Sequence, residues 1–183
     1  MIAKINSTVP EEIKNIPKDN PVAYFAMGSS GRPKVIKKII EGFKDQPFTV
    51  IAPVKKMIEG LNVDIPENVF VTGWVPALEV SKMADISIIH GGIGTVMTAA
   101  LAGKPVVGVG MMYEQEYNIE CLVRKGFAKR ISRNLLTSRL LNNTIISLLS
   151  DEQAKQKAQE YQKVVEKWHD PEIVRNFFRE NFL

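Results

Sequence analysis

A histidine and a group of glycines form the part of this sequence best suited to chemistry. His90-Gly91-Gly92-Ile93-Gly94-Thr95 follows the apolar run 86–89 and precedes a run of small and apolar residues at 96–102. This order predicts a strand, a glycine-rich turn and a helix. Glycines let backbone N–H groups approach a ligand closely, and a helix start adds unpaired donors and a positive dipole end. The stretch therefore predicts an anion site, most often for phosphate, with His90 facing the same crevice.

Two other interpretations of this turn stay open. It can be a tight strand-to-helix connection that binds no ligand. It also partly matches a dinucleotide-binding fingerprint, because Gly92-x-Gly94 follows a strand and Glu114 lies about twenty residues further on. Met97 occupies the position of the third glycine in that fingerprint, so the match is incomplete. His90 can likewise donate to a phosphate oxygen or simply end the strand.

Other polar and aromatic residues follow predicted strands. Gly28-Ser29-Ser30 forms the turn after the first strand. Trp74 can border a base or cap the core, and Glu114-Gln115 can bind sugar hydroxyls or simply place acidic charge at a helix start. Tyr113 and Tyr117 are expected to pack rather than to bind a ligand. No zinc-type spacing, Walker lysine or nucleophile elbow is present in the sequence.

The composition is that of an ordinary globular protein: 183 residues, 45% apolar and 24% charged, with a net charge of +4. The basic residues form no stripe with interleaved aromatics, which argues against nucleic acid as a partner. The one cysteine, Cys121, excludes an internal disulfide and leaves no thiol cluster for a metal. No apolar run of about 18 residues predicts a membrane span. With no leader pattern either, a cytoplasmic location is expected.

The elements that must position these residues alternate along the chain. Strands are predicted at 21–26, 48–51, 68–72, 85–89, 105–109 and 127–131. Helices are predicted at 33–43, 55–61, 78–83, 96–102 and 115–125. Three more are predicted towards the end of the chain: one with Thr137 as its N-cap, a solvated surface helix at 151–167, and one that begins at Pro171. This alternation predicts an α/β, Rossmann-like open parallel sheet of about six strands. Ligands bind such sheets outside the carboxyl ends of the strands.

Several of these motifs together resemble the donor-binding signature of the GT-B UDP-glycosyltransferase family. They are Gly73-Trp74-Val75-Pro76, His90-Gly91-Gly92-Ile93-Gly94-Thr95, Ala100-Leu101-Ala102-Gly103-Lys104-Pro105, Glu114-Gln115-x-x-Asn118 and Gly126. Their order and spacing match the family over residues 20–135. Tyr24-Phe25-Ala26-Met27-Gly28-Ser29-Ser30 is similar to the first strand and phosphate turn of the family's carboxyl-terminal domain.

The resemblance implies a role for each motif residue and a nucleotide-sugar donor, UDP- or dTDP-linked. The sequence demands no metal ion or cofactor, because backbone N–H groups and His90 can serve as the donors. Ser29, His90, Gly92, Gly94 and Thr95 would hold the diphosphate, Trp74 and Val75 would border the base, Glu114 and Gln115 would contact the sugar, and Asn118 would lie beside it. Thr98 stands where UDP-using members commonly have a glutamate that grips both ribose hydroxyls. This departure leaves room for a dTDP-sugar, whose deoxyribose lacks one hydroxyl.

The resemblance also implies that the chain is half of an enzyme. Residues 1–20 would be an extended interdomain lead-in, 21–167 the donor-binding domain and 168–183 a helix that crosses back to an amino-terminal acceptor domain. That domain, in the same protein or in a partner chain, would carry the catalytic base. The whole enzyme would transfer a hexosyl group to a hydroxyl of a small lipophilic acceptor, and this chain alone would bind donor without turnover. An NAD(P)-binding oxidoreductase domain and a non-catalytic interaction domain are the alternatives.

Overall fold

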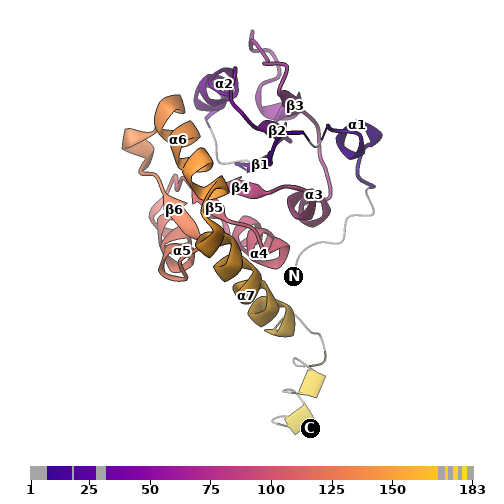
Figure 1. The fold of residues 1–183 in the computed structure, drawn as a ribbon, viewed down its shortest axis with the longest axis vertical. Coiled ribbons are helices and arrows are strands. Elements are labelled where there is room, and N and C mark those ends of the chain that lie inside the picture. The colour runs from indigo at the N-terminus through magenta and orange to yellow at the C-terminus, as the bar shows by residue number, and fades with distance from the viewer. Residues whose placement is uncertain are drawn as a thin grey trace.

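Parallel strands form a six-stranded sheet at the centre of the protein (Figure 1). The structure is a computed structural model that describes residues 8–17, 19–27, 32–168, 172, 175–176 and 179–180. The strands are β1 (Val22–Ala26), β2 (Thr49–Ala52), β3 (Val69–Val71), β4 (Ile86–Ile89), β5 (Val106–Gly108) and β6 (Ala128–Arg130). Their order is β3-β2-β1-β4-β5-β6, and each neighbouring pair is parallel. The predicted Rossmann-like α/β sheet is confirmed.

Helices cover both faces of the sheet, which explains why the central strands are continuous apolar runs. One face carries α2 (Pro33–Glu41) and α6 (Ser138–Leu149), and the other carries α1 (Glu11–Lys14), α3 (Ala77–Met83), α4 (Ile93–Ala102) and α5 (Tyr113–Arg124) (Figure 1). Alternate residues of β1 point to opposite faces of the sheet: Phe25 packs in the layer of α2, and Tyr24 packs in the layer of α4.

The last long helix, α7 (Glu152–Trp168), joins the two layers. Its Ala154 packs in the layer of α2 and α6, whereas its Ala158 packs in the opposite layer. Further along, Val165 packs against α4, and Gln162 Nε2 donates to the carbonyl oxygen of Leu101 at 3.0 Å. The expectation of a solvated helix is therefore only half right, because small residues on one face of α7 are buried.

Two other segments differ from the sequence-based expectation. The lead-in was expected to be extended, yet Glu11–Lys14 is helical, and Ile13 and Ile16 are buried against the sheet. Two apolar residues are too few to show a period in sequence, so only packing reveals this turn. The helix expected at 55–61 is a single 3-10 turn, Lys55–Met57. The N-cap at Thr137 is confirmed, since its side chain accepts from Leu140 N at 3.2 Å.

The boundaries expected at residues 20 and 167 stay predictions. Most of the expected crossing helix, 168–183, lies outside the described residues, which include only its scattered positions 168, 172, 175–176 and 179–180. Among the helices that the structure describes, none is long and apolar enough to cross a membrane.

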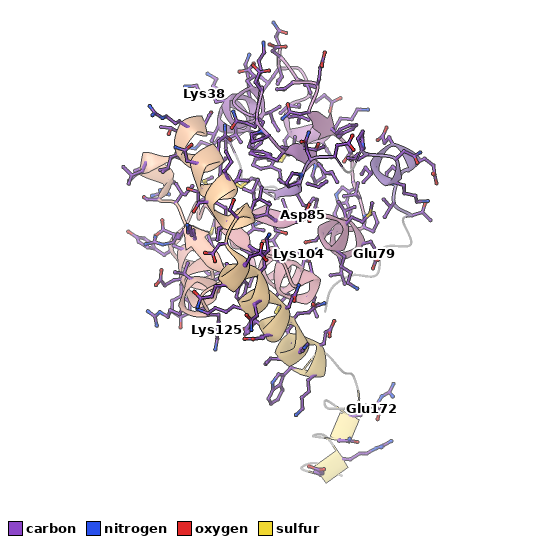
Figure 2. The ribbon with its side chains drawn as sticks, viewed as in Figure 1. Lys38, Glu79, Asp85, Lys104, Lys125 and Glu172 are labelled. Carbon is purple, nitrogen blue, oxygen red and sulfur yellow. The ribbon has the colours of Figure 1, made fainter. Side chains whose placement is uncertain are left out.

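Asp85 joins the amino ends of the two central strands. Its carboxylate Oδ2 accepts from Val22 N at 2.8 Å, and its own N–H donates to the Val22 carbonyl oxygen at 2.7 Å. Figure 2 shows Asp85 beside the start of β4, with Glu79 out on α3. Because Val22 is buried, its N–H has no ready access to water as a substitute partner. Asp85 therefore helps to set the register of β1 on β4.

Replacing Asp85 by alanine should lower the free energy of unfolding by about 1–2 kcal/mol, because a buried N–H loses its acceptor. Thermal unfolding should show this as a fall in midpoint of about 3–6 °C. Asp85→Asn keeps an oxygen acceptor and should recover most of the loss. Glu79→Ala, on the exposed face of α3, is the matched control and should leave the midpoint nearly unchanged. Equal effects of Asp85→Ala and Glu79→Ala would contradict the role of this hydrogen bond.

Candidate anion site at the carboxyl edge of the sheet

The predicted glycine turn joins β4 to α4 at the carboxyl edge of the sheet. β4 ends at Ile89 and α4 begins at Ile93, so residues 90–92 make the turn. Gly91 has φ +85°, and a Cβ at this position would lie 2.4 Å from the carbonyl oxygen of Gln115. Both the conformation and the space require glycine. The turn is thus held tightly against α5.

The turn lies where the strand order of the sheet reverses. From β1 the chain continues outward to β2 and β3, whereas from β4 it continues in the other direction to β5 and β6. Ala26 and Ile89 are paired at the carboxyl ends of β1 and β4. Open α/β sheets bind ligands in the crevice outside such a reversal point. Residues 28–31, which include the candidate Ser29 and follow β1 in sequence, lie outside the described residues, so the role of Ser29 stays a prediction.

The first turn of α4 offers backbone donors to this crevice. Gly92 is the N-cap residue and contributes no side-chain cap, while its carbonyl oxygen accepts from Val96 N at 3.0 Å and from Thr95 Oγ1 at 2.9 Å. α4 has no acidic residue in its first turn to offset the positive dipole end. A Cβ built on Gly94 meets no described atom within 4 Å. No side-chain cap therefore occupies the unpaired N–H groups of this helix start, as an anion site requires.

His90 lies at the centre of this arrangement. The residue is only 8% exposed, and its Nδ1 lies 3.3 Å from the carbonyl oxygen of Ala26 on β1. A Cβ at Gly92 would come 2.6 Å from Nε2, so the ring edge lies directly over the N-cap of α4. Burial lowers the pKa of His90, while the hydrogen bond to the Ala26 carbonyl and the charge of Glu114 act in the opposite direction.

The polar residues at the start of α5 divide into different roles. Asn118 Nδ2 donates to the Gly91 carbonyl oxygen at 3.0 Å and to Glu114 Oε1 at 3.1 Å. Glu114 itself is exposed at the crevice. Gln115 is only 4% exposed, and its Oε1 accepts from Met111 N at 2.9 Å, which holds the loop after β5. Of the two predicted sugar contacts, Glu114 is thus exposed at the surface. The side-chain oxygen of Gln115 instead accepts a hydrogen bond from the backbone of Met111.

The remaining candidates lie at different depths. Trp74 follows β3 with its side chain 78% exposed, so the expectation that it caps the core is excluded. Val75, its neighbour, is buried in the layer of α3 and α4. Thr98 is buried on α4, three residues beyond Thr95. In the described part of the chain, no group of His, Cys, Asp and Glu residues could hold a metal ion.

Sequence reasoning missed the aromatic rim of the crevice. The sequence predicts that Tyr113 and Tyr117 pack, but they are 90% and 67% exposed. Met112, just before α5, and Ile93, at the start of α4, are also exposed. Their spacing of four residues on α5 places the two tyrosines on one helix face, a signal that sequence could have supplied. The Ala26 carbonyl was also missed, because a backbone partner leaves no trace in residue types.

Comparison with known proteins identifies the fold and its relatives. The family model described as "Erythromycin biosynthesis protein CIII-like, C-terminal domain" matches residues 45–177. The NDP-glycosyltransferase YjiC of Bacillus subtilis is 31% identical over 150 residues, which cover 80% of this chain and 38% of that protein. The spinosyn forosaminyltransferase SpnP superposes with a TM-score of 0.81 at 20% identity, over 94% of this chain and 46% of that one.

A crystal structure of the glycosyltransferase VinC in complex with dTDP superposes with a TM-score of 0.73 at 21% identity, over 87% of this chain and 41% of that one. The chain thus spans less than half the length of each of these relatives. The GT-B resemblance drawn from the glycine turn and its companion motifs is confirmed. By the extent of the family match, this chain belongs to the erythromycin biosynthesis protein CIII-like carboxyl-terminal domains of GT-B glycosyltransferases.

Proposed function

We propose that this chain binds the diphosphate of a UDP- or dTDP-sugar at the N-terminus of α4, as the donor domain of a glycosyltransferase. One observation carries the proposal: the uncapped helix start, with no described atom within 4 Å of a Cβ at Gly94, lies beside His90 where the strand order reverses. Backbone N–H groups there stabilise the negative charge that develops on the leaving diphosphate. These donors can act without a metal ion.

The groups around the helix start supply the other parts of a donor site. Glu114 is an exposed acceptor for sugar hydroxyls at the start of α5. Trp74 follows the carboxyl end of β3 and is exposed, so its ring is available to stack on a base. Gln115 supports the site by fixing the loop at Met111, since its side-chain Oε1 accepts from Met111 N.

The whole enzyme is proposed to transfer a hexosyl group to a hydroxyl of a small lipophilic acceptor. The catalytic base would come from an amino-terminal acceptor domain, in the same protein or in a partner chain, since the relatives are more than twice as long as the matched region. The exposed rim residues Met112, Tyr113 and Tyr117 suit contact with such a domain or with the acceptor. This chain alone is expected to bind donor without turnover.

Thermal unfolding with dTDP, UDP and NAD in turn tests this proposal. A ligand at about 100 times its dissociation constant adds roughly 2.7 kcal/mol to the stability of the bound form. For a domain of this size the midpoint should rise by about 5–10 °C with dTDP or UDP. A rise with NAD alone would favour an oxidoreductase domain. No rise with any nucleotide would favour a domain that does not bind donor.

Gly94→Ala separates a ligand site from a plain connection. No described atom lies within 4 Å of the added methyl group, and alanine suits a helix, so the free protein should gain about 0.5 kcal/mol in stability. In the ligand-bound state the methyl group would occupy space needed by a phosphate and weaken dTDP binding about tenfold or more. Asn143→Ala on the exposed face of α6 is a matched control that should leave binding intact. Unchanged binding by Gly94→Ala would place the diphosphate elsewhere.

Thr98→Glu tests how the chain chooses its nucleotide. A carboxylate at this position of α4 should gain a charge-assisted hydrogen bond to a ribose with both hydroxyls, worth about tenfold in affinity for UDP relative to dTDP. Thr98→Val, which keeps the shape but removes the hydroxyl, should leave the ratio of the two dissociation constants nearly unchanged. Titration calorimetry with both nucleotides measures that ratio. An unchanged ratio in Thr98→Glu would mean that residue 98 does not face the ribose.

A further inference from the structure

The two ring nitrogens of His90 have different surroundings, and this difference determines which of them carries a proton. Nδ1 lies 3.3 Å from the Ala26 carbonyl oxygen. A carbonyl oxygen can only accept a hydrogen bond, so Nδ1 is the donor and carries a hydrogen. In the neutral imidazole, Nε2 then has no hydrogen and is itself an acceptor.

Nε2 lies where the proposed phosphate would bind. It is 2.6 Å from the position of a Cβ on Gly92, the N-cap residue of α4. Ile93, the next residue, begins α4, so the unpaired N–H groups of the first helical turn follow directly on Gly92. A phosphate oxygen that accepts from these groups therefore approaches Nε2 as well. With a neutral ring, the lone pair of Nε2 would face a negatively charged oxygen.

We infer that His90 binds the donor diphosphate as an imidazolium, so that the chain takes up a proton with each nucleotide sugar. This inference rests on the proposed donor site. In the charged ring, Nδ1 keeps its bond to the Ala26 carbonyl oxygen and Nε2 becomes a donor to the phosphate. The resulting cation also offsets the charge that develops on the leaving diphosphate during transfer.

In the free protein, burial keeps the proton affinity of His90 low, while two neighbouring groups act against it. Burial lowers the pKa of His90, and the positive end of α4 acts in the same direction. From β1 the Ala26 carbonyl, and from α5 the Glu114 carboxylate, raise it. Residues 28–31, between β1 and α2, are Gly-Ser-Ser-Gly and contain no titratable side chain. The charges of a bound diphosphate raise the pKa further, which is what couples binding to protonation.

The sign of the pH dependence follows from this coupling. The bound state has the higher pKa, so affinity is greatest at low pH, where His90 is charged in both states. As pH rises from the free pKa to the bound pKa, affinity falls by up to about tenfold per pH unit. Proton uptake is largest in that same interval.

Calorimetry of nucleotide-sugar binding in buffers with different heats of ionisation measures the proton uptake directly. The probes are dTDP-glucose and UDP-glucose, whose diphosphates are esterified at both ends and do not change charge near neutral pH. In a series from about pH 5.5 to about pH 8.5, net proton uptake of up to one proton per ligand is expected, and the dissociation constant should increase as the pH rises. Binding with no uptake across this range would overturn the inference and leave the donor site standing.

Two variants assign the proton to His90. His90→Gln keeps a neutral N–H donor but cannot titrate, so it should bind more weakly, take up no proton and show a flat pH profile. His169→Gln changes the only other histidine and should keep the uptake of the unmodified chain. Uptake that persists in His90→Gln would assign the proton to another group and overturn the inference. Failure of the unmodified chain to bind either nucleotide sugar at any pH would contradict the proposed function itself.

Discussion

The parallel pairing of β1 with β4 is the constraint on which the rest of the structure depends. The two strands are distant in sequence but run side by side from Ala23 and Ile86 to Ala26 and Ile89. Because they are parallel, their carboxyl ends reach the same edge of the sheet, which brings the Ala26 carbonyl to the ring of His90. Asp85 secures the opposite ends of the same pair. The position of the histidine is therefore a property of the sheet, not of its own turn alone.

The short turn after β4 explains why the start of α4 remains open to a ligand. Gly91 takes a conformation that suits glycine, and its carbonyl oxygen is held by Asn118 of α5. Gly92 follows as an N-cap without a side chain. A glycine cap is less favourable than serine or asparagine by only a few tenths of a kcal/mol. For this small cost, the first N–H groups of the helix stay available to an anion, and the ring of His90 has room over the backbone.

α5 shows how one helical turn can serve both the fold and a site. Successive residues on a helix point in directions about 100° apart, so neighbours in sequence serve different surroundings. Glu114 faces the solvent-filled edge, Gln115 points inward to hold the loop at Met111, and Asn118 bridges Glu114 to the glycine turn. The carboxylate of Glu114, which raises the pKa of His90, thus lies in the same turn of α5 as Gln115, which holds the loop at Met111. Substitutions here will change binding through geometry as well as through direct contact.

The sequence by itself determined the strands, the main helices and the position of the glycine turn, because buried runs, capping residues and glycines are local signals that act within a few neighbours. It also placed Thr137 at a helix start. It did not reveal the packed turn at Ile13 or the exposure of Tyr113. The packed turn and the exposed tyrosine depend on which surfaces meet in the fold. The same holds for the hydrogen-bond partner of His90 Nδ1 and for the inward direction of the Gln115 side chain. Only the tertiary structure decided them, because contacts between distant segments depend on strand order and register, which residue types do not encode locally.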